Sequence, residues 1–227
     1  MFAWVGVATE SQRLVIEWLE RGLGQVDYRK EVIELTPEED AGQAAQDYLE
    51  KLMVDRHEIM YPALQCAEEF MGFLEVLKLR EVRSYLEIGA RYGGTFEAVM
   101  DSLPRGSKGV AIDFPGGEWG DQNSLVALSE AMKRQHNAGQ DVSLILGPSS
   151  APEVVERAGV RAPYDCVFID ADHSYQGVRL DFELYARMGK MVVLHDIVNP
   201  GVEVPRYWNE IKGRYKHVEI AIDGANM

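Results

Sequence analysis

The sequence predicts an α/β protein, in which an open parallel sheet is sandwiched by helices and preceded by a helical N-terminal segment. Two observations predict this class. From residue 82 onward, short apolar runs of strand length alternate with amphipathic stretches of helix length. Such alternation needs crossover connections, which place parallel strands side by side and cover both faces of the sheet. Before about residue 80 the hydrophobic period is helical instead.

Strands are expected where apolar residues run without interruption: Val82–Ile88, Gly109–Ile112, Val142–Leu146, Cys166–Ile169, Val192–Leu194 and Val218–Ile222. Amphipathic segments, which predict helices, occupy residues 94–102, 122–137, 152–159, 176–188 and 203–213. Each helix should bury its apolar stripe against the sheet.

Residues 1–80 are expected to form a helical cap or oligomerisation segment, and residues 81–227 the main domain. Thr9–Gln12 and Thr36–Glu39 have the pattern of capping boxes, the second with proline at the first helical position. A third helix is expected from Pro62 to Leu77. The apolar faces of these helices need a partner, either the main domain or a second copy of the chain; an independently functioning module is the alternative.

Composition excludes several classes of partner. The 23 Lys and Arg against 37 Asp and Glu give a net charge of −14, whereas nucleic acids and anionic membranes require a dense basic surface. The two cysteines, Cys66 and Cys166, have neither disulfide-framework nor metal-site spacing. The sequence has neither a signal-peptide pattern nor an apolar run of about 18 residues. A cytoplasmic protein is therefore expected.

Ligands of an open parallel sheet bind beyond the carboxyl ends of its strands. The first such turn, Glu87–Thr95, reads EIGARYGGT, and its glycines allow the backbone to approach a ligand. Arg91 stands where a dinucleotide-binding turn would have glycine, and Glu87 would repel a pyrophosphate but could accept hydrogen bonds from an ammonium group. Asp113 ends the next strand, about twenty residues beyond Gly93, where it can hold ribose hydroxyls. These features predict an adenosine ligand that carries a positive charge.

This pattern resembles the cofactor site of class I S-adenosylmethionine-dependent methyltransferases, above all the stretch ELGAxxGxS of catechol O-methyltransferase. The resemblance implies a Rossmann-like class I methyltransferase fold and S-adenosyl-L-methionine as cofactor. By that resemblance Glu87 and Gly89 line the methionine end, Asp113 binds the ribose, and Phe114 with the loop 115–121 covers the adenine. The residues that it assigns to the cofactor are Glu87, Gly89, Ala90, Arg91, Gly93, Thr95, Asp113, Phe114, Ser149 and Asp170.

The assignment of Ser149 has an alternative. Gly147–Ser150 stands where many relatives have Gly-Asp-Ser, but Pro148 replaces the aspartate. Ser150–Glu153 also has the pattern of a helix cap. Both interpretations remain open at the level of sequence.

A second cluster follows two neighbouring strands, one ending in Asp170-Ala171-Asp172-His173 and the other in His195-Asp196. Carboxylate oxygens suit Mg²⁺, and imidazole also accommodates Mn²⁺ or another divalent cation. The pattern resembles a bacterial group of metal-dependent O-methyltransferases, similar to macrolide and sugar O-methyltransferases and to cephalosporin-hydroxylase-like proteins. That resemblance covers roughly residues 60–227. It implies metal ligands Asp170, His195 and Asp196, a small hydroxylated acceptor and a role in natural product biosynthesis, although relatives often have Glu where this chain has His195.

His173 is the expected general base, acting beside Asp170, because an imidazole accepts a proton near neutral pH. One alternative is that Asp172 and His173 cap a helix or support the metal ligands without contacting the metal. Another is that the same cluster forms the metal centre of a hydrolase. For the whole protein, the rival functions are a nicotinamide-dependent oxidoreductase and a non-catalytic S-adenosylmethionine-binding protein.

The resemblance also raises a question of topology. The sheet of a class I methyltransferase usually ends in an antiparallel pair of strands, and this sequence stops just after the first of them. The final strand is therefore lost by truncation, missing, or supplied from elsewhere.

Overall fold

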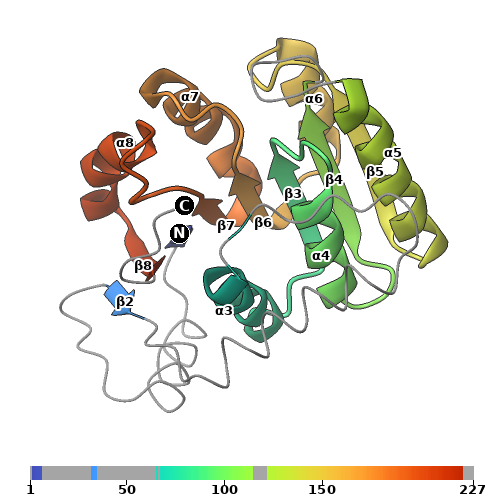
Figure 1. Ribbon diagram of the computed structural model, residues 1–227, viewed down its shortest axis with the longest axis horizontal. Coiled ribbons are helices and arrows are strands. Elements are labelled where there is room, and N and C mark those ends of the chain that lie inside the picture. The colour runs from blue at the N-terminus through green and yellow to red at the C-terminus, as the bar shows by residue number, and fades with distance from the viewer. Residues whose placement is uncertain (1, 7–31, 35–64, 66, 115–121, 222–227) are drawn as a thin grey trace.

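The computed structural model describes residues 2–6, 32–34, 65, 67–114 and 122–221. Within these residues the chain forms an eight-stranded sheet in the order β2-β8-β1-β7-β6-β3-β4-β5 (Figure 1). The strands are β1 (Phe2–Gly6), β2 (Val32–Glu34), β3 (Ser84–Ile88), β4 (Lys108–Asp113), β5 (Asp141–Leu146), β6 (Tyr164–Ile169), β7 (Gly189–Leu194) and β8 (Lys216–Ala221).

The five central strands are parallel, as the sequence predicts. β3 pairs with β4 on one side and with β6 on the other, β4 pairs with β5, and β6 pairs with β7. From β3 the chain adds β4 and β5 on one side, and then crosses back to add β6 and β7 on the other side of β3. The carboxyl ends of β3 and β6 lie next to each other at this point, which is where an open α/β sheet binds its ligands.

Helices cover both faces of the sheet, and each face has its own hydrophobic core. One core joins the sheet to α3, α4 and α5 through Phe73, Phe96 and Leu128, among others. The other joins it to α6, α7 and α8 through residues such as Phe182 and Trp208. The helices are α3 (Ala67–Leu79), α4 (Gly94–Ser102), α5 (Gln122–Asn137), α6 (Pro152–Val160), α7 (Tyr175–Tyr185) and α8 (Val204–Ile211).

Strand β1 is the main departure from the sequence prediction. It lies antiparallel between β7 and β8, with Ala3 opposite Leu194 on one side and Glu219 on the other. β2 extends the sheet parallel to β8. The sequence predicts only helices in residues 1–80. The five residues of β1 are too few to show the alternation of apolar and polar residues that predicts a strand. Within the described residues, β1 thus provides an antiparallel strand between β7 and β8.

The expected helices at Thr9 and Thr36 lie outside the described residues, and so does the expected start of the third helix at Pro62. The described part of that third helix, α3, begins at Ala67 and ends at Leu79. Its Phe70, Phe73 and Leu77 are buried against the sheet. Among the described helices, none is long and apolar enough to cross a membrane.

Candidate active site

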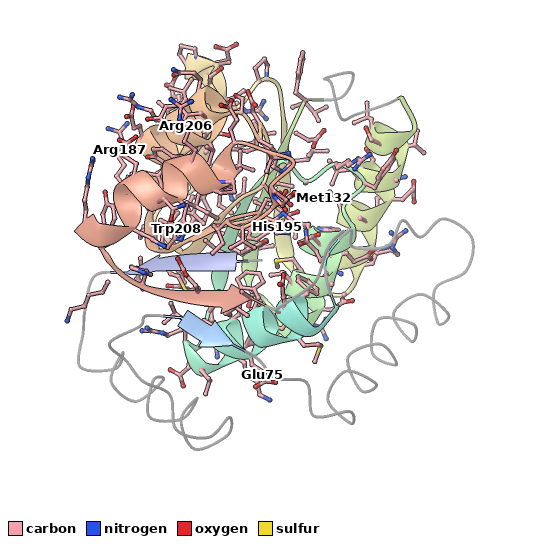
Figure 2. All side chains as sticks on the ribbon, turned by 60° about the vertical axis from the view of Figure 1, so that its left-hand side comes forward. Glu75, Met132, Arg187, His195, Arg206 and Trp208 are labelled. Atoms are coloured by element: carbon pink, nitrogen blue, oxygen red, sulfur yellow. The ribbon has the colours of Figure 1, made fainter. Side chains whose placement is uncertain are left out.

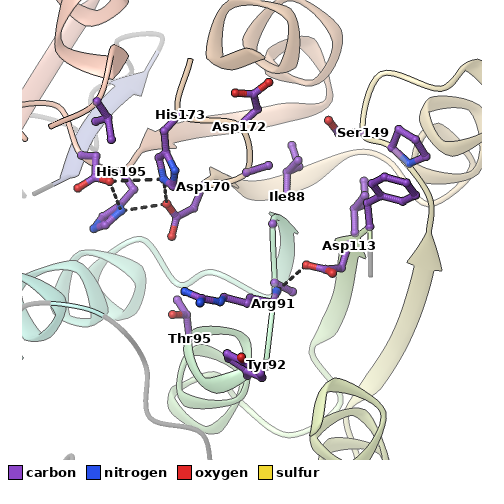
Figure 3. Close-up of a pocket in the computed structure, with 18 of the residues that line it drawn as sticks. Ile88, Arg91, Tyr92, Thr95, Asp113, Ser149, Asp170, Asp172, His173 and His195 are labelled. Carbon is purple, nitrogen blue, oxygen red and sulfur yellow. Dashed lines mark hydrogen bonds and ion pairs between the residues drawn. The ribbon is translucent and has the colours of Figure 1, made fainter. Parts of the chain in front are cut away.

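A cavity of about 590 Å³ lies at the carboxyl ends of β3, β4, β5, β6 and β7. Its size is in the range of small-molecule and cofactor sites. The cavity is elongated between two groups of polar residues (Figure 3): Asp113 and Ser149 lie at one end, and Asp170, His173 and His195 lie at the other. The sequence places these residues far apart, and the sheet brings them to one edge.

The turn after β3 depends on Gly89. Its φ of +91° is a conformation that favours glycine. A Cβ atom at this position would lie 2.3 Å from the backbone oxygen of Asp170, so only glycine allows the ends of β3 and β6 to approach so closely. Gly93, with φ +85°, then starts α4. The backbone conformation at both positions favours glycine, and the predicted approach of a ligand to this turn stays a prediction.

Asp113 is fixed in orientation at the end of β4. Its Oδ2 accepts a 2.6 Å hydrogen bond from the backbone N–H of Arg91, which itself has a positive φ of +47°. Burial raises the pKa of Asp113, while the Arg91 N–H opposes this shift. The carboxyl group lines the cavity, so an oxygen acceptor is held at the place where the sequence predicts ribose recognition.

The Arg91 side chain runs along the cavity from the Asp113 end towards Thr95 (Figure 3). Its guanidinium carbon lies 5.1 Å from the centre of the Tyr92 ring, which is within the range of a cation–π contact. Thr95 lies in the first turn of α4 and also lines the cavity. A cation and a hydroxyl group therefore line the middle and the left-hand part of the cavity in this view.

Glu87 is not one of the residues that line the cavity. Its side chain is 1% exposed and accepts a 2.6 Å hydrogen bond from the Tyr85 hydroxyl. Burial raises the pKa of Glu87 to about 8, against the lowering effect of the Tyr85 hydrogen bond. The predicted contact between Glu87 and the cofactor stays a prediction, and the geometry assigns the residue a position behind the turn.

The Asp113 end of the cavity also includes Phe114 and the segment after β5. Phe114 is 53% exposed and lines the cavity, while the loop 115–121 lies outside the described residues. The backbone oxygen of Ser149 accepts a 2.6 Å hydrogen bond from the Tyr185 hydroxyl of α7. The N-cap of α6 is Ala151, and no side chain caps it. The interpretation of Ser150 as a helix cap is therefore wrong, because α6 begins one residue later than that pattern requires.

The second predicted cluster assembles around one carboxylate. Asp170 Oδ1 lies 2.9 Å from His195 Nδ1 and 3.0 Å from His173 Nε2. Asp196 Oδ2 lies 3.4 Å from His173 Nε2 and 3.6 Å from His195 Nδ1. One potential ligand atom from each of these four residues falls within 4.8 Å of the other three. Such a set of two carboxylates and two imidazoles fits a divalent cation.

The cluster is held at the centre of the molecule. His195 is 5% exposed and lies inside the fold, whereas Glu75, Arg187 and Arg206 lie at its periphery (Figure 2). Burial alone would raise the pKa of Asp170, but the neighbouring imidazoles of His195 and His173 hold it below its usual range. Conversely, the hydrogen bond to Asp170 raises the pKa of His173.

The backbone at Asp196 is also unusual, with a φ of +58°. Non-glycine residues rarely adopt this left-handed conformation, although aspartate tolerates it better than most. The conformation turns the chain immediately after His195 and keeps both side chains at the cluster. Such local strain is typical of functional sites.

Asp172 has a structural contact that separates it from the cluster. Its Oδ1 accepts a 2.8 Å hydrogen bond from the Ser174 N–H. Ser174 is the N-cap of α7 and accepts a hydrogen bond from the Gly177 N–H. The capping alternative thus applies to the turn around Asp172, whereas the His173 ring faces Asp170 and Asp196.

Gln65 is a cavity residue that the sequence analysis did not identify. Its Nε2 donates to Thr95 Oγ1 and to Asp170 Oδ2, both at 3.3 Å. A single glutamine in front of a helix has no spacing or motif that would reveal it. Only the packing of α3 beside α4 brings it to the strand ends.

The comparisons with known proteins concern the domain and its fold. Residues 86–197 match a family model described as a methyltransferase domain. The chain carries a methyltransferase domain. This matched region begins within β3 and ends just after Asp196, so it contains both ends of the cavity. In a search of the curated proteins, none matches the chain.

Two solved structures share the fold of this chain. The O-methyltransferase TomG from Streptomyces achromogenes, solved in complex with SAM, matches with a TM-score of 0.50 and 17% identity over 91% of this chain and 88% of TomG. Cofactor-bound Rv0187 from MTB matches with a TM-score of 0.51 and 18% identity over 88% of this chain and 84% of Rv0187. At such identities the likeness establishes the class I methyltransferase fold.

Proposed function

We propose that the protein is an S-adenosylmethionine-dependent O-methyltransferase that uses a divalent cation and acts on a hydroxyl group of a small molecule. The observation that carries the proposal is the cavity, which has an oriented Asp113 at one end and the Asp170 cluster at the other. An adenosine bound at Asp113 would extend its sulfonium towards the cluster. Both TomG and Rv0187 were solved with a cofactor bound, which supports a cofactor in this region.

Different residues of the chain bind different parts of the cofactor. Asp113 accepts hydrogen bonds from the ribose hydroxyls, and Phe114 with Ser149 borders the adenine. Gly89, Ala90 and Gly93 keep the backbone close to the cofactor. Arg91 and Thr95 extend towards the other end of the cavity, where the guanidinium group suits the carboxylate of the methionine moiety.

The donor set fits a divalent cation, which Asp170, His195 and Asp196 would hold. When bound, the cation supplies Lewis acidity that lowers the pKa of a hydroxyl group and orients it. Mixed oxygen and imidazole donors suit Mn²⁺ or a similar ion as well as Mg²⁺. The Asp170 carboxylate, which has a pKa below its usual range, stays ionised at neutral pH and is available for such a role.

The reaction itself is an in-line displacement. The acceptor oxygen forms a bond to the methyl carbon while the bond from that carbon to sulfur breaks, so the sulfonium becomes a neutral thioether. The hydroxyl proton passes to the imidazole of His173. Because Nε2 of this ring faces the ionised carboxylate of Asp170 and donates to it, Nδ1 is the nitrogen that accepts the proton. Because the sulfonium is already an activated leaving group, the protein mainly orients the acceptor and removes its proton.

The acceptor is expected to be a neutral or cationic hydroxylated molecule. Asp170, Asp172 and Asp196 line the cavity, and the chain has a net charge of −14. The proposed cation balances the charges of Asp170 and Asp196, so the repulsion of an anionic acceptor comes from Asp172 and from the net negative charge of the chain. Sugars, phenols and hydroxylated macrocycles satisfy this requirement.

The experiment is a methyl-transfer screen. The protein is incubated with S-adenosylmethionine and a panel of sugars, phenols and macrolides, with either Mg²⁺ or Mn²⁺ or with a chelator, and S-adenosylhomocysteine is measured. Acceptor-dependent product that needs a cation supports the proposal. Turnover that is equally fast in chelator would remove the cation from it, and product formed on an amine alone would remove the hydroxyl acceptor.

A further inference from the structure

Gln65 joins the two halves of the proposed site. Its Nε2 donates to the hydroxyl group of Thr95, in the first turn of α4, and to Oδ2 of Asp170, at the end of β6. Gln65 also lines the cavity. It therefore lies beside the end of the cavity that is opposite to Asp113, where the amino-acid part of the cofactor is expected.

The orientation of the Gln65 carboxamide follows from its partners. An ionised carboxylate only accepts hydrogen bonds, so the NH₂ group of Gln65 must face Asp170. The carbonyl oxygen Oε1 consequently faces elsewhere. It is buried, and it accepts no hydrogen bond from any residue in the described part of the chain. A buried acceptor without a donor is unfavourable, so a ligand that brings a donor gains binding energy at this position.

The α-ammonium group of S-adenosylmethionine is such a donor. It carries three N–H bonds and a positive charge. Glu87, the acceptor that the sequence suggests for it, lies behind the turn with its carboxyl group on the Tyr85 hydroxyl and does not line the cavity. Gln65 lies beside Thr95 and Asp170, and its Oε1 is a buried acceptor that receives no hydrogen bond from the described part of the chain.

We propose that Gln65 Oε1 accepts a hydrogen bond from the α-ammonium group of the cofactor, which makes Gln65 a specificity determinant for the amino-acid end of S-adenosylmethionine. The proposal rests on the proposed function. The same carboxamide holds Asp170 through Nε2, so Gln65 links the cofactor to the cluster that handles the acceptor. A cofactor without its amino-acid end would lose this contact and keep those of the adenosine.

The test compares two ligands on two proteins by calorimetry. S-adenosylhomocysteine carries the ammonium group, and 5′-methylthioadenosine has the same adenosine thioether without an amino-acid end. In Gln65→Met, which keeps the length of the side chain and removes its polar atoms, affinity for S-adenosylhomocysteine should fall by about 10- to 100-fold, as expected for a hydrogen bond to a charged group. Affinity for 5′-methylthioadenosine should change by less than about twofold. The proposal would be overturned if the affinities for both ligands fell equally, or if neither affinity fell.

Two further arms keep the outcome decisive. Gln140→Met is the matched control, because Gln140 is a buried glutamine that bonds Met100 O and the Ser107 N–H away from the cavity; it should lower the melting temperature and leave the ratio of the two affinities unchanged. If Gln65→Met does not fold, wild type is titrated with a deaminated S-adenosylhomocysteine, which should bind about 10- to 100-fold more weakly than the parent. Equal binding of the two would overturn the proposal. Failure of wild type to bind any of these ligands would instead contradict the proposed function.

Discussion

The Tyr85 hydroxyl donates a hydrogen bond of 2.6 Å to the Glu87 carboxyl group, and both side chains are buried beneath α3 and α4. The two residues are separated by one position on β3, so their side chains point to the same face of the sheet. The pKa of Glu87 is raised to about 8, so this carboxyl group is mostly neutral at pH 7. Glu87 thus supports the strand before the glycine turn from behind.

The first prediction concerns Glu87 and pH. Because the pKa of Glu87 rises from 4.5 to about 8 on folding, its contribution to stability is present at low pH and is lost as the pH rises through this range. Glu87→Gln has no such dependence. The stability of the variant relative to wild type should increase by up to about 1.4 kcal/mol per pH unit between these values, measured by urea unfolding from pH 5 to pH 9. The exposed Glu153→Gln should follow the wild-type curve; a Glu87→Gln curve parallel to wild type would contradict the account.

A second prediction concerns the glycine turn. Gly89→Ala places a Cβ atom 2.3 Å from the backbone oxygen of Asp170 and forces alanine into a positive φ. Gly106 also has a positive φ, of +82°, but a Cβ atom there would have no neighbour within 4 Å. Gly106→Ala should therefore cost about 1 kcal/mol for the backbone conformation alone, while Gly89→Ala should cost at least about 3 kcal/mol and abolish cofactor binding. Similar melting temperatures for the two variants would show that β3 and β6 do not approach as closely as described.

The third prediction concerns Asp113. Asp113→Ala removes the proposed ribose acceptor and the partner of the Arg91 N–H. Affinity for S-adenosylhomocysteine should fall by about 10- to 100-fold, since charge-assisted hydrogen bonds are lost. The matched control is Asp141→Ala. Asp141 is the first residue of β5, at the edge of the sheet away from the cavity, and pairs with Arg161 on the surface. The affinity of this variant for S-adenosylhomocysteine should equal that of wild type. If Asp113→Ala bound as tightly as the control, Asp113 would not contact the ribose.

The fourth prediction separates the cation from the cofactor. Asp196→Ala removes one oxygen donor from the cluster and should weaken Mn²⁺ binding by about 100-fold or more, because even outer-sphere partners of metal ligands are worth 10- to 100-fold. Affinity for S-adenosylhomocysteine should stay within about threefold of wild type. Asp172→Ala, whose side chain bonds the Ser174 N–H instead, should retain Mn²⁺ affinity. Full activity of Asp196→Ala in chelator, with an acceptor that wild type methylates, would remove the metal from the mechanism.

Much of the parallel sheet could be predicted from sequence, because buried strands between amphipathic helices leave a strong periodic signal. Each of the five central strands was expected at its observed place, with ends within two or three residues. The place of Asp113, Asp170 and Asp196 at the cavity could be predicted for the same reason: the carboxyl ends of parallel strands share one edge of the sheet, so these positions follow once the strands are known.

Other features needed the fold. Phe2–Gly6 enters the sheet between β7 and β8 through pairing with residues about 190 and 215 positions away, and no local pattern encodes such a partner. Gln65 reaches the cavity through the packing of α3. The position of Glu87 behind the turn depends on which face of β3 it occupies, which the motif EIGARYGGT does not specify.

Calorimetric titration with S-adenosylhomocysteine, run once with Mg²⁺ and once with chelator, tests the central claim most directly. Micromolar binding is expected in both conditions, because Asp113, the glycine turn and Gln65 are proposed to hold the cofactor and the cation is proposed to bind the acceptor. No binding in either condition, by protein that circular dichroism shows to be folded, would contradict the assignment of this cavity to S-adenosylmethionine.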